Sequence, residues 1–148
     1  MKKLLFIIPL LAVVLAAFRP AGTEIAVIIN KENVVDKLTE GEVKLYWLRK
    51  IKKRWPDINK NIKPADRKSK CEEQDSFYEK VLGMSSSDVE TYFTQKQYEN
   101  AEKPQDKFAS DSAIIDFVAQ EVGAIGFVNV SSLSADAKSK VKVVLIVK

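Results

Sequence analysis

Apolar residues fall along the chain in short runs that alternate with stretches of helical periodicity. Residues 24–30 are β-branched and almost continuously apolar, which is typical of a strand covered on both faces. Similar runs occupy residues 124–130 and 141–147, and residues 107–109 predict a shorter strand. Because strands that alternate with helices assemble into layers, we expect an α/β fold: a single domain with one mixed sheet flanked by helices.

Capping residues mark where the helices between these strands should begin. Thr39 with Glu42 and Ser87 with Glu90 each match a capping box. The first of these helices is expected to end at Trp55, before Pro56, because proline disfavours helical geometry in the preceding residue. A later helix should begin at residues 110–112 and stop at Gly123, after residues 95–106 have formed a polar loop. The residues expected to point inward from the first helix are Val43, Tyr46, Trp47 and Ile51.

The stretch Asn61–Gly83 reads as a short strand, a polar turn and a helix that ends at a left-handed glycine. Its helix opens with Glu72, Glu73 and Asp75, which suit the positive end of the helix dipole. Unpaired backbone N–H groups at such a helix start also bind anions. The sequence therefore predicts a ligand site at residues 66–73, with Asn30 and residues 110–112 as neighbours.

The N-terminus has the pattern of a secretory signal, with Lys2 and Lys3 before an apolar run over residues 4–17. We expect a signal peptide at 1–22 and a domain at 23–148 that is exported to the periplasm, with an uncleaved anchor as the alternative. The whole chain has 24 basic and 20 acidic residues, and residues 1–22 hold three of the basic ones and none of the acidic ones. The remainder has 21 against 20, so nucleic acid is not an expected partner.

Cys71 is the only cysteine and there is no histidine. An internal disulfide is therefore impossible, and a metal centre or a histidine-dependent triad is not expected. We predict no cofactor and no enzymatic activity. Two interpretations of Cys71 remain open: a partly buried, unreactive thiol, or an intermolecular disulfide in an oxidising compartment.

Residues 49–54 form a basic cluster. Cations at the end of a helix offset its dipole, which is one explanation of the cluster. The other is a docking patch for an acidic partner or anionic lipid. Trp55, which follows, is interpreted as a core residue rather than a ligand-stacking ring.

Several segments taken together resemble the phosphate-binding, periplasmic substrate-binding proteins of ABC transporters. These are the initial strand ending in Asn30, residues 48–55, Ala65-Asp66-Arg67, and Gly-Ala-Ile-Gly-Phe-Val at 123–128. The resemblance covers roughly residues 24–130 and is to the second lobe of a type II, two-lobed receptor. It implies a single-lobe version of that fold, a small oxyanion such as phosphate as ligand, and a membrane permease as partner.

The family motif in this lobe is an arginine followed four residues later by Ser-Gly-Thr. Arg67 matches the arginine, but Cys71, Glu72 and Glu73 stand in the three later positions. A weak thiol donor and two carboxylates replace hydroxyl donors and glycine, and carboxylates repel an anion. The resemblance therefore leaves Arg67, Ser69, Lys70 and Cys71 as the candidate oxyanion ligands.

Two functions follow from the sequence. The first is an exported, substrate-binding-like protein that binds phosphate or a related oxyanion weakly. The second is a cell-envelope accessory or protein-interaction module that keeps the fold and has lost phosphate binding. The oligomeric state is left open by the sequence.

Overall fold

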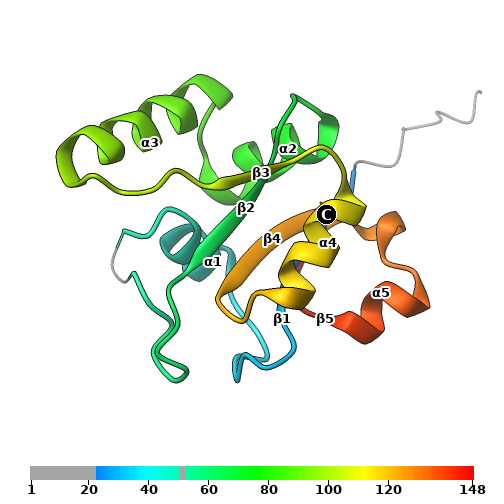
Figure 1. Cartoon of the computed structure of the whole chain (residues 1–148). Helices are drawn as coiled ribbons and strands as arrows, with labels where there is room; N and C mark the ends of the chain where they lie inside the picture. Colours follow the sequence, from blue (N-terminus) through cyan, green and yellow to red (C-terminus); the bar gives the residue numbers. More distant parts are fainter. Residues whose placement is uncertain (1–22, 51–52) are drawn as a thin grey trace, which may run out of the picture.

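The computed structural model describes residues 23–50 and 53–148 (Figure 1). The predicted signal peptide and Ile51 lie outside these residues. Within them, five strands form one mixed sheet in the order β3-β2-β4-β1-β5. Strand β2 is parallel to β3 and β4, while β1 is antiparallel to β4 and β5. The predicted α/β fold with one mixed sheet is confirmed. The strands are β1 Ile25–Asn30, β2 Lys63–Arg67, β3 Asp106–Phe108, β4 Ala124–Asn129 and β5 Val141–Val147.

Strand β1 separates two hydrophobic cores. Ile25, Val27 and Ile29 face one core and Ala26 and Ile28 face the other, and all five side chains are fully buried. Alternation of side chains along a strand places successive residues on opposite faces of the sheet, so both faces of β1 are covered. The continuous apolar run predicted this burial correctly.

The helices cover the two faces separately (Figure 1). The larger core is closed by the first set of helices and is rich in aromatic rings, with Phe77 stacked on Phe127 at a centroid distance of 4.2 Å. The first set comprises α1 Glu40–Trp47, α2 Glu72–Phe77 with its π-helical continuation η1 Tyr78–Leu82, and α3 Ser86–Asn100. The second face carries α4 Asp111–Gln120 and α5 Ala135–Lys140, which follows the short 3-10 turn η2 Val130–Ser132.

Helix α1 is shorter than predicted. Its capping box of Thr39 and Glu42 is present, but the helix ends at Trp47 rather than continuing to Trp55. Arg49 adopts a left-handed φ of 51°, and the Leu48 carbonyl accepts a hydrogen bond of 2.7 Å from Tyr92 Oη. The chain can then turn back, so Trp55 enters the core, where it is 1% exposed and donates from Nε1 to the Gly123 carbonyl. Trp55 is therefore a core residue, as expected.

Helix α3 begins two residues earlier than predicted and runs longer. Ser85, not Ser87, is the N-cap, and it forms the capping box with Asp88. The polar residues 95–100, predicted as loop, are helical to Asn100, since Gln, Lys and Glu are good helix formers even on an exposed helix. Only Val89 and Phe93 of α3 are buried.

Gly123 does not end a helix in the left-handed conformation, because α4 already ends at Gln120 and Gly83 is the only described glycine with a positive φ. Gly123 instead permits close backbone packing. A Cβ atom there would lie 1.9 Å from the Asn61 carbonyl oxygen, so no other residue fits.

Candidate ligand-binding corner

The predicted strand, turn and helix are present at the carboxyl end of β2. Strand β2 ends at Arg67, residues 68–71 connect it to α2, and Cys71 is the N-cap residue of that helix. The helix ends after its π-helical turn at Gly83, whose φ of 62° is the predicted left-handed conformation. We call the region from Asp66 to Glu73 the corner.

Arg67 is held in the corner by an acidic side chain of α4. Its Nη1 donates to Asp111 Oδ1 at 2.6 Å, and its Nη2 donates to the Ala109 carbonyl at 3.2 Å. Asp111 Oδ2 accepts from the Asn129 backbone N–H and from Ser132 Oγ. The side chains of Arg67 and Asp111 are only 16% and 10% exposed, so the ion pair is strong and the arginine charge is largely neutralised within the chain.

Asp66, which is fully buried, connects the corner to the helices around it. Its Oδ1 accepts from the Arg67 backbone N–H and from Gln74 Nε2, and its Oδ2 accepts from the Tyr78 hydroxyl and Gln105 Nε2. Burial, together with the Asp66 charge, raises the pKa of Tyr78 far above its ordinary value, so this hydroxyl remains a donor. A buried carboxylate with this many donors fixes the end of β2 against α2 and η1.

The Glu73 carboxylate of α2 modifies the helix start. Partial burial raises the pKa of the Cys71 thiol, and the neighbouring Glu73 carboxylate adds to this effect. Partial burial also pushes the pKa of Glu73 upward. Its own backbone N–H, the Cys71 thiol, the Arg67 charge and the Asn129 side chain outweigh that effect, so the pKa of Glu73 is lower than usual. Glu73 is therefore an internal anion at the corner.

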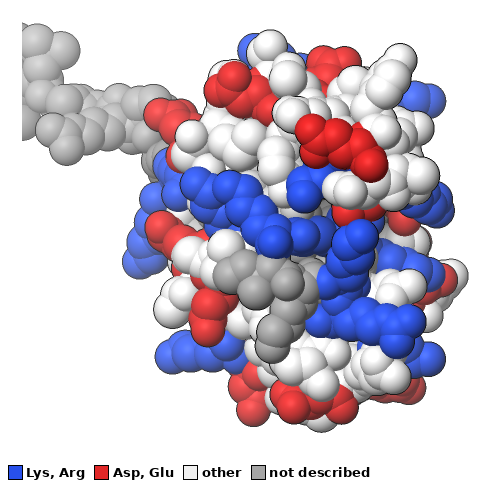
Figure 2. Space-filling view, turned by 90° about the vertical axis from the view of Figure 1, so that its left-hand side faces the viewer, with Lys and Arg blue, Asp and Glu red and all other residues white. Residues whose placement is uncertain are grey.

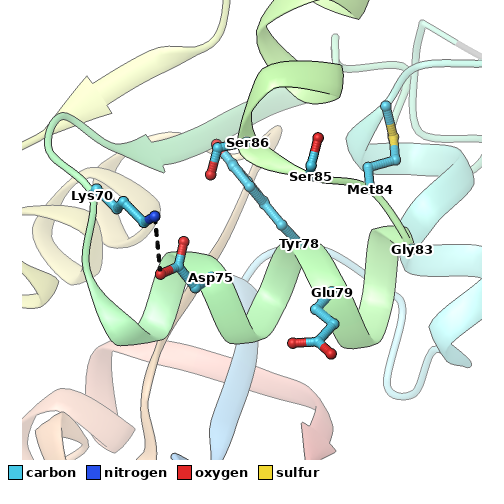
Figure 3. Close-up of a pocket in the computed structure, with 8 residues that line it drawn as sticks. All are labelled: Lys70, Asp75, Tyr78, Glu79, Gly83, Met84, Ser85 and Ser86. Carbon is cyan, nitrogen blue, oxygen red and sulfur yellow. Dashed lines mark ion pairs between the residues drawn. The ribbon is translucent and has the colours of Figure 1, made fainter.

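The candidate ligands do not converge on one hollow. Arg67 lines a polar hollow of about 150 Å³ together with Lys68, Gln74, Tyr78, Ser86, Val89, Glu90, Gln105 and Lys107. Lys70 lines a separate hollow of about 620 Å³ between α2, η1 and the start of α3. Figure 3 shows Lys70 extending toward Asp75, with its Nζ 4.0 Å from Asp75 Oδ2. Ser69 is exposed in the connection, and neither Ser69 nor Cys71 lines either hollow.

The prediction that Asn30 is a neighbour of the corner is wrong. Strands β1 and β4 are antiparallel, so the carboxyl end of β1 lies beside the amino end of β4, and β2 starts at the same level. Asn30 Nδ2 accordingly donates to the carbonyls of Val118 and Ala119 at the end of α4. Asn30 and Arg67 therefore lie at opposite ends of the strands. Residues 110–112 were placed correctly, because Asp111 binds Arg67.

Asp66 and Asp111 fell inside the ranges predicted from the sequence, yet neither was given a role. An acidic residue directly before the arginine, at the end of a buried strand, was the available signal. Within residues 23–50 and 53–148, no group of three or more His, Cys, Asp or Glu side chains is arranged to hold a metal ion. In the same part of the chain, no helix has the length and apolar character needed to cross a membrane.

Comparison with known proteins relates this geometry to solved structures. No protein-family model and no curated sequence match the chain. An ABC-type phosphate transport receptor from Vibrio cholerae matches with a TM-score of 0.59 at 18% identity over 82% of this chain and 46% of its own. A phosphate ABC transporter substrate-binding protein from Clostridium perfringens, with bound phosphate, matches with a TM-score of 0.59 at 22% identity, over 82% of this chain and 45% of its own. PstS from Borrelia burgdorferi matches with a TM-score of 0.57 at 17% identity, over 82% of this chain and 47% of its own.

The chain therefore spans less than half the length of each of these structures and shares the fold of that part. At such low identity the likeness shows the fold alone. The predicted α/β architecture of one lobe agrees with this shared fold.

Proposed function

We propose that this chain is an exported, non-enzymatic, substrate-binding-like domain whose corner at the end of β2 binds a small oxyanion weakly. The observation that carries the proposal is the hollow beside Arg67, which brings Arg67, Lys68 and Lys107 together against a single carboxylate, Glu90. An excess of positive charge in a concave, polar site favours an anion. At about 150 Å³, the hollow suits an ion the size of phosphate better than a drug-sized ligand.

The same geometry explains why binding should be weak. Arg67 already donates to Asp111 and Ala109, and Glu73 adds negative charge near the guanidinium. A desolvated oxyanion needs a full set of donors, and this hollow has few that are not already engaged within the chain. The phosphate-binding structures of the same fold are about twice as long as the matched part, which supports a ligand site shared with a second lobe or partner such as a transporter permease.

Isothermal titration with inorganic phosphate and with sulfate tests the proposal. We expect dissociation constants in the millimolar range, since few donors remain free. Lys107→Gln, which alters no hydrogen bond of the described corner, should weaken binding by several-fold, and Lys138→Gln on α5 should not. Absence of heat at millimolar anion, or equal binding by the Lys107 and Lys138 variants, would contradict an oxyanion site.

The internal pairing of Arg67 with Asp111 favours a second candidate, an envelope accessory module that has lost phosphate binding. Under that alternative neither the wild-type chain nor Arg67→Gln gives heat of binding in the titration with phosphate or sulfate. Cross-linking in membranes, with a permease or another envelope protein identified as the partner, would then support the accessory role.

A further inference from the structure

A cationic face lies away from the corner, where the end of α1 meets α3. We define it by four side chains: Lys50, Lys53, Arg54 and Lys96. Figure 2 shows Lys and Arg side chains gathered in a band across this side of the molecule, with acidic side chains mostly toward its edges. The sequence placed three of these residues in one basic cluster, and the fold adds Lys96 from α3.

A framework beneath the face brings the two segments together. Tyr92 donates from Oη to the Leu48 carbonyl at 2.7 Å, and its ring lies 5.9 Å from Lys50 Nζ and 5.7 Å from Lys96 Nζ. Glu102, whose side chain is 9% exposed, lies 3.0 Å from Lys53 Nζ and 3.9 Å from Arg49 Nη2. Arg49 also donates to the Lys103 carbonyl, and Glu102 offsets part of the charge of both Lys53 and Arg49.

The charge of the face is only partly compensated. Lys53 is 67% exposed, and the Arg54 guanidinium donates to the neutral amides of Asn59 and Asn61. Residues 23–148 carry 21 basic and 20 acidic residues, a net charge of +1, so subtracting the four cations leaves −3. The domain is thus close to neutral overall, so attraction to an anionic surface has to come from a local group of cations such as this face.

We propose that this cationic face docks on an anionic membrane surface. Lysines make up most of the face, and lysine is a point charge suited to headgroup phosphates, whereas protein interfaces are depleted in lysine and enriched in aromatic residues and arginine. The large exposed apolar side chains of the described chain are Val34, Tyr98 and Ile146, and none belongs to the face. Since the described residues of the face are cationic and include no large exposed apolar side chain, the binding that they provide should be electrostatic and salt-sensitive.

The contribution of each cation to membrane binding can be measured. Each Lys or Arg close to an anionic surface strengthens binding about fivefold, so removing two should weaken it roughly 30-fold. Flotation of the full chain with vesicles of phosphatidylcholine, alone or mixed with phosphatidylglycerol, measures the phosphatidylglycerol-dependent and salt-sensitive part of binding. The test variant is Lys50→Gln/Lys96→Gln, and the matched control is Lys138→Gln/Lys148→Gln, which removes the same charge from α5 and from the residue after β5.

We expect the test variant to lose most of the salt-sensitive binding and the control to keep it. Equal binding by the two variants, equal binding to both kinds of vesicle, or binding that high salt leaves unchanged would overturn the proposal. Capture of soluble poly-glutamate without any binding to phosphatidylglycerol vesicles would also overturn it, in favour of an acidic protein partner. Circular dichroism of each variant checks that it is folded.

Discussion

Arg67 Nη1 lies 2.6 Å from Asp111 Oδ1, and this ion pair joins the end of β2 to the first turn of α4. Through Asp111 the pair also reaches the Asn129 backbone and Ser132, so three segments distant in sequence meet at one buried carboxylate. The ion pair stabilises the corner and at the same time occupies the arginine that an oxyanion would use.

Replacing Asp111 with Asn should destabilise the fold. The change leaves Arg67 as a mostly buried cation without its anionic partner, which costs about 3 kcal/mol. Urea denaturation of Asp111→Asn measures the loss of unfolding free energy, and Ser112→Ala, at an exposed neighbouring position, is the control. A loss as small as that of the control would show that the pair is not a stabilising element.

Restoring hydroxyl donors and glycine at the start of α2 should improve anion binding. Cys71→Ser/Glu72→Gly/Glu73→Thr removes two carboxylates and adds two donors, and each repulsive charge near an anion costs about 1 kcal/mol or more. We expect phosphate affinity to rise at least tenfold in isothermal titration. Glu72→Ala/Glu73→Ala, which removes the same two carboxylates but adds no hydroxyl donor, is the comparison that separates charge from hydrogen bonding. An unchanged affinity in the triple variant would place the anion elsewhere.

The thiol of Cys71 should react slowly near neutral pH. Burial and the Glu73 carboxylate raise its pKa, so the thiolate is scarce until the pH exceeds the ordinary value for cysteine. Alkylation rates measured from pH 7 to 10 should rise later for the wild type than for Glu73→Gln, which loses one of the causes. Glu79→Gln should follow the wild type. A profile for Glu73→Gln that is identical to wild type would mean that Glu73 does not influence the thiol.

Glu102 should contribute to the loss of stability in acid. Burial tends to raise its pKa, but Lys53, Arg49 and Lys96 outweigh that effect and hold the pKa below its unfolded value. A carboxylate with a depressed pKa stabilises the fold above its unfolded pKa, near 4.5, and this contribution is lost as the pH falls through the folded pKa. Thermal unfolding of wild type and Glu102→Gln should therefore differ at pH 7 and converge in acid. A difference that is constant with pH would contradict this linkage.

Two glycines should respond to alanine in opposite directions. At Gly126 a Cβ atom would lie 2.7 Å from Ile114 Cγ2, where β4 packs against α4, so Gly126→Ala should destabilise the fold by about 1–3 kcal/mol. At Gly41 in α1 the nearest atom would be 4.0 Å away, so Gly41→Ala should stabilise it by about 0.5–1 kcal/mol. Urea denaturation of both variants measures the two effects. A Gly126→Ala variant as stable as the wild type would contradict the close approach at Gly126, and a destabilised Gly41→Ala variant would contradict the open space at Gly41.

The pattern of apolar and polar residues was sufficient for the sheet and for most helix starts. The run at residues 24–30 predicted a strand buried on both faces, and Ser110 and Thr39 predicted their helices, because burial periodicity and capping are local. The end of α1 depends on a contact distant in sequence: the Tyr92 hydroxyl, more than 40 residues away, donates a hydrogen bond to the Leu48 carbonyl. The prediction of Ser87 as the N-cap of α3 was wrong, because Ser85 also has an acidic residue three positions later and the structure uses that pair.

By itself, the sequence determined an α/β domain with one mixed sheet. It also determined a strand that ends at Arg67, a polar turn, and a helix whose first turn carries Glu72. Only the tertiary structure decided what surrounds Arg67. Strand direction brings Asp111 to Arg67 and places Asn30 at the opposite end of the strands. The physical reason is that hydrogen-bond partners and ion pairs depend on how strands are ordered and oriented. Periodicity along one segment carries no information about that order.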